Sequence, residues 1–221
     1  MATPSLMNWT ETFSGRVVDL MDIENSDLHI PDIIHNICKN RRFLGGTARG
    51  ISIAEHSVNV SRIVELISWD VEHSVVSVAK KIALFHDGAE AYTGDIPGPY
   101  KSEFFMRRGF VEKSIVSIDK EITDWIYNKI LVIKSAERLV EAARLVKKAD
   151  LYCLAIERHD LLPNSKSDNW IGFDDIVKSS DFRSIKENIY YDPAELTESA
   201  IYRMFTLRMK AVGLANPEDY A

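Results

Sequence analysis

Two neighbouring residues, His86 and Asp87, have types and positions that suit chemistry. They end an apolar run over residues 78–85 that is typical of a helix with one buried face. An imidazole beside a carboxylate has no packing purpose there, but both side chains can turn toward one point where the backbone leaves the helix. Histidine and aspartate are also metal ligands and proton carriers. The pair therefore predicts a chemical site at the end of this helix.

His56 and Asp150 extend this pattern on two other predicted helices. His56 follows Glu55 in a helix over residues 52–68, and Asp150 interrupts an apolar stripe over residues 145–155. A buried carboxylate without a partner is costly, so Asp150 is expected to meet either a lysine or a metal ion. Taken alone, His56 is more typical of a packed or solvated histidine. The full set supplies two nitrogen and two carboxylate ligands: His56, His86, Asp87 and Asp150.

The types of these ligands indicate which ions they would bind. Imidazole and carboxylate groups with positions left for water suit Mn, Co, Fe or Ni better than a closed structural zinc site. Mg and Zn are further candidates. The cysteines, Cys38 and Cys153, lie far apart in apolar helical contexts, which predicts buried reduced thiols rather than a disulfide. A metal would therefore be held mainly by nitrogen and oxygen.

Helical periodicity dominates the chain, and it predicts an all-α fold. Ser52 followed by Glu55 is a capping-box pattern at one helix start. The first thirty residues are consistent with either a short hairpin or an irregular arm. Loops rich in Gly, Pro, Ser and Asn are predicted at 44–50, 93–99 and 162–170. The predicted helices cover residues 30–40, 52–68, 74–87, 103–131, 135–158 and 194–211.

The composition is that of a soluble globular protein. The 221 residues suit a single domain, 46% of them are hydrophobic, and no run of eighteen apolar residues predicts a membrane span. A net charge of −6 argues against a broad nucleic-acid surface. The start of the chain lacks a signal-peptide pattern. We therefore expect a cytoplasmic protein, in the host cytoplasm if it is phage-encoded, with no nucleic-acid or membrane partner; homo-oligomer formation is left open.

Several sequence blocks in one order resemble the HD superfamily of metal-dependent phosphohydrolases. SIAEHSVNVSRIV is similar to that family's first-ligand helix, ALFHDGAEAYTGDIPGPYK to its His-Asp block, and KKADLYCLAIERHDLL to its last-ligand helix. The segment before them resembles a bacterial and phage branch with 5'-deoxynucleotidases and deoxynucleoside triphosphohydrolases. The resemblance covers about residues 13–163 and implies a single HD-domain helical bundle, with 164–221 as a helical extension.

The resemblance also implies roles for individual residues. The four ligands would bind one divalent ion. Glu90 and Asp95 would be the catalytic acids outside the metal shell, one acting on water and the other on the leaving sugar oxygen, with the division of roles left open. Arg42 and Lys101 would contact phosphate, and Phe43 would touch the base or sugar. The alternatives are solvated charges for the cations, a surface helix position for Glu90 and a turn position for Asp95.

The resemblance implies an enzyme that removes phosphate from a 2'-deoxynucleotide, with the conversion of dATP to deoxyadenosine as the leading expectation. The alternatives are a 5'-deoxynucleotidase acting on monophosphates and a nucleotide-binding HD domain without catalysis. The chain departs from the family at Gly46, where histidine is frequent, and at Ile51, where tyrosine is common. Both departures concern the choice of base and the exact phosphate contacts rather than the metal ligands.

Overall fold

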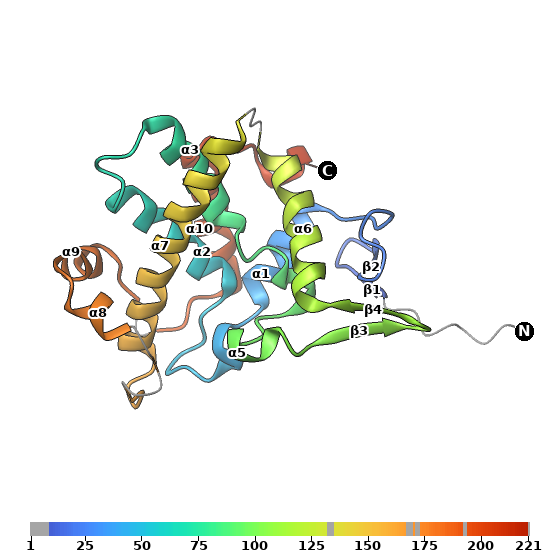
Figure 1. Cartoon of the computed structure of the whole chain (residues 1–221), viewed down its shortest axis with the longest axis horizontal. Coiled ribbons are helices and arrows are strands. Elements are labelled where there is room, and N and C mark those ends of the chain that lie inside the picture. The colour runs from blue at the N-terminus through green and yellow to red at the C-terminus, as the bar shows by residue number, and fades with distance from the viewer. Residues whose placement is uncertain (1–8, 132–134, 167–169, 171–172, 192–193, 221) are drawn as a thin grey trace, which may run out of the picture.

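A computed structural model describes residues 9–131, 135–166, 170, 173–191 and 194–220 of the chain. It is mostly helical (Figure 1), which confirms the coarse prediction from periodicity. Among the described residues, two short 3-10 helices, η1 (Arg42–Gly45) and η3 (Pro217–Tyr220), accompany the α-helices. The α-helices are α1 (Ile30–Lys39), α2 (Ile53–Leu66), α3 (His73–Phe85), α4 (Glu90–Thr93), α5 (Gly98–Lys101), α6 (Ile115–Ile130), α7 (Ala136–Leu161), α8 (Phe173–Lys178), α9 (Ser180–Asn188) and α10 (Glu198–Ala211).

The helices α2, α3 and α7 pack against one another and carry the four candidate ligands. Their apolar faces form one buried cluster that includes Ile63, Ile82 and Ile156. The start of α2 is set by Ser52, whose hydroxyl accepts a hydrogen bond from the Glu55 amide at 3.0 Å, so the predicted cap is confirmed. Burying these faces removes apolar surface from water and fixes the three helices relative to one another.

A second buried cluster lies on the other side of α2 and α3, where α1, α6 and α10 meet. Phe205 of α10 packs edge to face on Phe85 of α3, with ring centroids 5.4 Å apart. Both side chains are fully buried. The C-terminal helix begins later than predicted, at Glu198, because Thr197 caps it. It belongs to the main core rather than to an appended layer.

The predicted helix over 103–131 is wrong in its first third. Residues 105–114 form an antiparallel hairpin of β3 (Phe105–Arg108) and β4 (Val111–Ser114), and α6 starts only at Ile115, after the Ser114 cap. Gly109 has φ 61° and, with Phe110, makes the two-residue turn. A glycine with positive φ at the first turn position is the signature of a tight hairpin. The apolar residues around Gly109 also fit helical spacing, which is why the sequence predicted a helix here.

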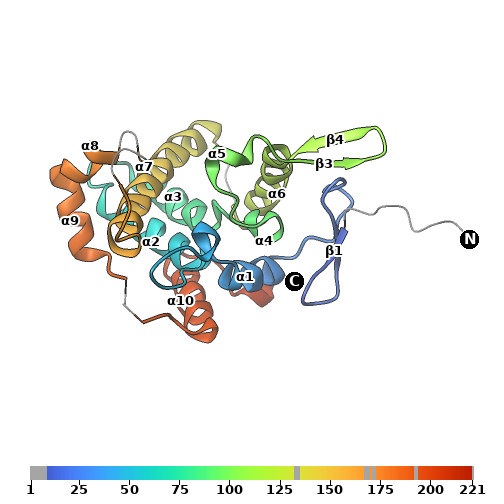
Figure 2. The same cartoon turned by 90° about the horizontal axis from the view of Figure 1, so that it is seen from below.

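The N-terminal region is a hairpin and not an irregular arm. Strand β1 (Trp9–Glu11) pairs with β2 (Val17–Asp19), and the buried carboxylate of Asp32 holds the connecting turn by accepting hydrogen bonds from Thr12 and Ser14. Both hairpins lie at one end of the molecule, far from α8 and α9 (Figure 2). The all-α prediction is thus corrected to a mostly helical fold with two small sheets.

Cys38 and Cys153 are free and buried, as expected from their apolar surroundings. Burial raises the pKa of the Cys38 thiol to about 12, so this thiol stays neutral near pH 7.

Within the described part of the chain, no helix has both the length and the apolar character needed to cross a membrane.

Candidate metal centre

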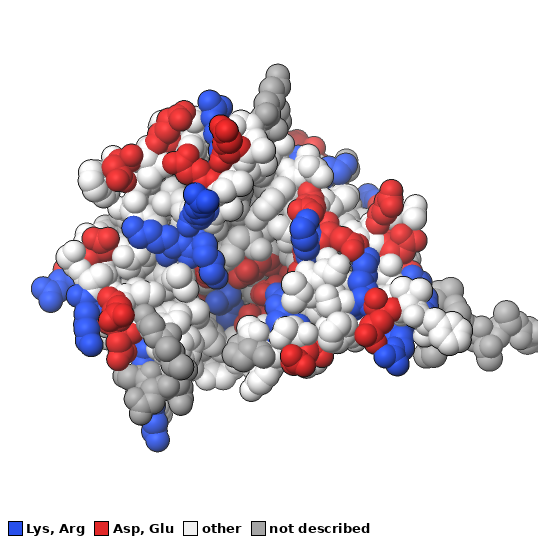
Figure 3. Space-filling model, in the orientation of Figure 1, with Lys and Arg blue, Asp and Glu red and all other residues white. Residues whose placement is uncertain are grey.

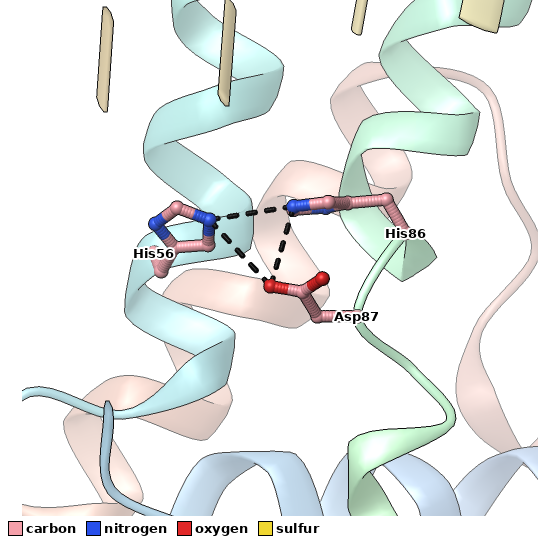
Figure 4. Close-up of side chains that lie close together, drawn as sticks. All are labelled: His56, His86 and Asp87. Atoms are coloured by element: carbon pink, nitrogen blue, oxygen red, sulfur yellow. Dashed lines mark hydrogen bonds and ion pairs between the residues drawn. The ribbon is translucent and has the colours of Figure 1, made fainter. Parts of the chain in front are cut away.

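The end of α3 turns two side chains toward α2. The helix stops at Phe85, His86 follows as its cap, and the Gly88 amide bonds back to the Phe85 carbonyl at 2.9 Å. Figure 4 shows the result: the rings of His56 and His86 and the carboxylate of Asp87 face one another. A Cβ at Gly88 would lie 2.8 Å from the Ile126 side chain, so glycine permits the close approach of α6 at this point.

The four predicted ligands lie close together. His56 Nε2 is 3.3 Å from His86 Nε2, 3.6 Å from Asp87 Oδ2 and 3.3 Å from Asp150 Oδ1. His86 Nε2 is 3.3 Å from Asp87 Oδ2 and 3.9 Å from Asp150 Oδ1. Metal–ligand bonds of about 2.1 Å place neighbouring ligand atoms about 3 Å apart. His56, His86 and Asp87 therefore form a group that could hold an ion, and Asp150 Oδ1 lies beside both rings.

The outer nitrogens of both histidines already have partners. His56 Nδ1 lies 2.7 Å from Glu157 Oε1, and His86 Nδ1 lies 2.8 Å from the Ala83 carbonyl oxygen. Both partners are acceptors, so each Nδ1 carries a hydrogen, and Nε2 is the atom of each ring that would offer its lone pair to an ion. A carboxylate or backbone carbonyl behind the ring is the usual support of a metal-binding histidine.

The charge at the centre calls for a cation. Two ring nitrogens lie beside two carboxylates, and such an arrangement is unfavourable unless a proton or a metal ion supplies positive charge. Burial and Arg42 lower the pKa of His56, but Glu157 and the hydrogen bond to Asp150 outweigh them and hold it well above the ordinary value. Burial raises the pKa of Asp87, while both histidines and Arg42 reverse this and lower it. The ligands are therefore suited to a divalent ion, which would replace the proton on His56.

Glu157 is a site residue that the sequence analysis missed. It is fully buried on α7, and its carboxylate accepts hydrogen bonds from His56 Nδ1, from Tyr191 at 3.0 Å and from Arg42 Nε at 3.2 Å. Burial raises its pKa, but Arg42 and His56 lower it to about 2. Its position seven residues after Asp150 places both acids on one face of the helix. An acid in an apolar stripe is the signal that could have identified it.

A second group of possible ligand atoms comes from His56, Cys153 and Glu157. Its geometry is that of a hydrogen-bonded cluster. Cys153 Sγ lies 3.7 Å from Glu157 Oε1 and 3.4 Å from the Tyr191 hydroxyl, and burial together with Glu157 raises the pKa of this thiol. Because a metal ligand must be a thiolate, these contacts favour a neutral thiol that supports Glu157.

Glu157→Gln is expected to weaken metal binding by about 10- to 100-fold, the usual cost of losing an outer partner of a ligand. The amide cannot accept from both His56 and Arg42, so the ring of His56 loses its fixed orientation. Dissociation constants for Co²⁺ or Mn²⁺ from chelator competition would measure the effect, with Glu141→Gln as the control at an exposed position of the same helix. An unchanged constant in the folded variant would show that Glu157 does not support the ligand.

A pocket of 320 Å³ opens beside the ligands His86 and Asp87. Glu90 lines it and is 6% exposed; one carboxylate oxygen lies 3.1 Å from Lys101 Nζ, and the other is buried with no hydrogen-bond partner among the described residues. Burial and Asp87 raise the pKa of Glu90 to about 8, against the opposing effect of Lys101. An acid held in this way beside the ligands is suited to accept a proton from a bound water.

Asp119 of α6 is a second residue that the sequence analysis missed. Its Oδ2 atom lies 2.5 Å from Lys101 Nζ, and its Oδ1 atom accepts a hydrogen bond from Thr93 at 2.8 Å. Lys101 is therefore held between Glu90 and Asp119. No local pattern in the sequence marks Asp119, because only the tertiary packing brings α6 against α4 and α5.

The remaining predicted residues lie around η1. Arg42 is buried and bonds Asp87 Oδ2 at 3.1 Å as well as Glu157, so its guanidinium is held by two carboxylates. The Phe43 ring lies 5.4 Å from that guanidinium. Its backbone, like that of Leu44, has positive φ (55° and 53°), a strained conformation for such residues. Asp95 accepts the Phe43 amide at 2.6 Å and thereby holds the turn.

The pocket next to the ligands includes some of the predicted residues and not others. Glu90 and Lys101 line it together with His86 and Asp87, whereas Phe43 and Asp95 are not among its lining residues. The structure therefore assigns Asp95 a contact that supports the turn, and its predicted part in catalysis stays a prediction. Phe43 likewise keeps its expected contact with base or sugar as a prediction.

Comparison with known proteins gives a family but no activity. No known family profile matches the chain. It is 33% identical over 159 residues to the uncharacterized protein YfdR of Escherichia coli (strain K12), a match that spans 70% of this chain and 73% of that protein. The chain belongs to the same family as YfdR. It is also 32% identical over 106 residues to an uncharacterized protein of Rhodobacter capsulatus, across 47% of this chain and 51% of that protein.

Proposed function

We propose that this protein is a metal-dependent phosphohydrolase of the HD type that removes phosphate from a 2'-deoxynucleotide, with dATP as the leading substrate. The observation that carries the proposal is the convergence of two histidine lone pairs and two carboxylates beside a pocket with a buried, half-partnered Glu90. A divalent ion bound by these residues would act as a Lewis acid toward a phosphate oxygen and would orient the attacking water. The HD resemblance of the sequence blocks supports the same reading.

The protein's own residues divide the remaining work. Glu90 would take a proton from the attacking water in its ionised form, which Lys101 favours. Attack at phosphorus forms a P–O bond to the water oxygen and breaks the bond to the sugar oxygen, which must gain a proton to leave as deoxyadenosine. Asp95 is our candidate for delivering that proton. Arg42 keeps Asp87 and Glu157 in place and retains donors for a phosphate oxygen.

A 5'-deoxynucleotidase is the second candidate, and one observation favours it. Arg42 and Lys101, which contact the acids of the site, are each held by two carboxylates. The interior of the site therefore supplies little free positive charge for more than one phosphate. A nucleotide-binding protein without catalysis is the third reading, and the buried Glu90 beside the ligands argues against it because such an acid costs stability.

Release of the deoxynucleoside, with orthophosphate from a monophosphate or tripolyphosphate from a triphosphate, tests the proposal on a small nucleotide panel. The panel contains dATP, dGTP, dCTP, dTTP, their monophosphates and ATP, with protein loaded in turn with Mn²⁺, Co²⁺, Ni²⁺ or Mg²⁺. We expect the deoxy series to be preferred and dATP to be near the top. Hydrolysis of ATP at an equal or higher rate would refute the deoxyribose preference. Cleavage of monophosphates alone would identify a 5'-deoxynucleotidase, and no cleavage of any member would overturn the enzymatic reading.

A further inference from the structure

Two helices form the walls of the candidate site, and both carry lysines at its edge. Figure 3 shows a hollow between α6 and α7, with acidic side chains at its floor and basic side chains along α7 and α6 beside it. Lys147 of α7 donates to Asp150 Oδ2 at 3.0 Å, and Lys120 of α6 lines the pocket next to His86 and Asp87. Lys147 therefore contacts a candidate ligand, and Lys120 lies at the pocket beside two others.

These two lysines differ from the cations inside the site. The Lys147 side chain is 71% exposed and that of Lys120 is 73% exposed. Their carboxylate partners are Asp150 for Lys147 and Asp124 for Lys120. The Lys120–Asp124 pair is exposed at both ends, and such a pair is weak and easily exchanged for another anion. Lys147 is exposed at its own end, while its partner Asp150 is mostly buried. Arg42 and Lys101, by contrast, are buried or half-buried and held by two carboxylates each.

The two oxygens of Asp150 show that Lys147 and a metal ion do not compete. Asp150 Oδ1 faces His56 and His86, whereas Oδ2 accepts from Lys147. The carboxylate can therefore bind an ion with one oxygen while Lys147 stays at the edge of the site. A phosphate chain that begins at the ion and leads outward would reach the exposed ammonium groups before it reaches bulk water.

We propose that Lys147 and Lys120 bind the outer phosphates of a nucleoside triphosphate, so that the site prefers a triphosphate over a monophosphate. This inference rests on the proposed phosphohydrolase function and adds the residues that recognise the phosphate chain. A phosphate nearest the sugar lies at the metal centre, and the next two phosphates extend along the edge between α6 and α7. Attraction between exposed charges and a polyanion falls with ionic strength, so the preference weakens in high salt.

Kinetics of Lys147→Met and Lys120→Met with dATP, dADP and dAMP test this recognition. The ratio of kcat/KM for dATP to that for dAMP is expected to fall by about tenfold in each variant, mainly through KM for dATP, as one charge-assisted bond is lost. Lys148→Met, next to Lys147 and exposed on the same helix, is the control and should keep the ratio. An equal loss for dATP and dAMP in Lys147→Met would show that this lysine acts only through Asp150 and would overturn the proposal.

A binding measurement keeps the inference separate from the reaction. Calorimetry of the Mn²⁺-loaded protein with inorganic tripolyphosphate and with orthophosphate is expected to show tighter binding of tripolyphosphate, by about tenfold or more, and loss of that difference in the double Lys variant. If no nucleotide is cleaved but tripolyphosphate still binds through these lysines, the proposed reaction fails while the phosphate site stands. If dAMP is cleaved and tripolyphosphate gains nothing, the phosphate site fails while the phosphohydrolase stands.

Discussion

Replacing His86 by alanine is expected to abolish stoichiometric binding of a divalent ion and, with it, phosphate release. The His86 ring would supply one of two nitrogen ligands through Nε2, because its Nδ1 bonds the Ala83 carbonyl. Asp150→Ala should have the same result, because Asp150 Oδ1 faces both ligand rings. We expect the affinity to fall by at least about 100-fold, the upper end of the cost of losing an outer partner of a ligand.

Metal content after dialysis, measured by elemental analysis, gives the first readout. Thermal unfolding with and without Mn²⁺ gives the second, since an ion at 100 times its dissociation constant stabilises the native state by about 2.7 kcal/mol. Only the wild type and the control His159→Ala should show this rise; His159 is exposed on α7, where it pairs with Asp160. Undiminished stoichiometric metal in folded His86→Ala and Asp150→Ala proteins would disprove the assignment of the ligands.

Glu90→Gln is expected to lower turnover by about 10²- to 10⁴-fold while the ion stays bound, the usual contribution of a general base. The amide keeps the size of the side chain and an oxygen for Lys101, but it cannot take a proton. Steady-state rates with saturating dATP, together with metal content, measure both parts of this expectation. Asp95→Asn is also expected to lower turnover; its amide oxygen can still accept the Phe43 amide. Wild-type rates in metal-loaded Glu90→Gln protein would show that Glu90 is not the general base.

Glu90 also gives a pH readout that does not depend on activity. Burial and Asp87 raise its pKa to about 8 in the folded, ion-free protein, from an ordinary value of 4.5. Between these two values the unfolded state has lost a proton that the folded state still holds, so wild-type stability falls as the pH rises. Relative to Glu90→Gln, the ion-free wild type should therefore lose melting temperature between pH 5 and pH 8. A constant difference between the two proteins would show that Glu90 is ionised at both pH values.

The types of residue at the candidate site were predictable from the sequence alone. An acid inside an apolar helical stripe and a His-Asp pair at a helix end are local patterns, because period 3.6 decides which face of a helix is buried. The long amphipathic helices and the Ser52 cap follow from the same local rules. Asp150 was therefore expected to meet a cation, and the structure places it beside His56, His86 and Lys147.

Other features depended on contacts between segments far apart in the chain. His56 and Glu157 are separated by 101 positions, and Lys101 meets Asp119 only because α6 packs against α4 and α5. The hairpin before α6 was wrongly predicted as helix because the apolar residues around Gly109 fit helical spacing equally well. Local periodicity determines which side chains turn inward, whereas packing of the helices determines which of them meet. The sequence thus determined the chemistry of the candidate ligands, and the tertiary structure decided their distances, their supporting partners and the exposed lysines at the edge of the site.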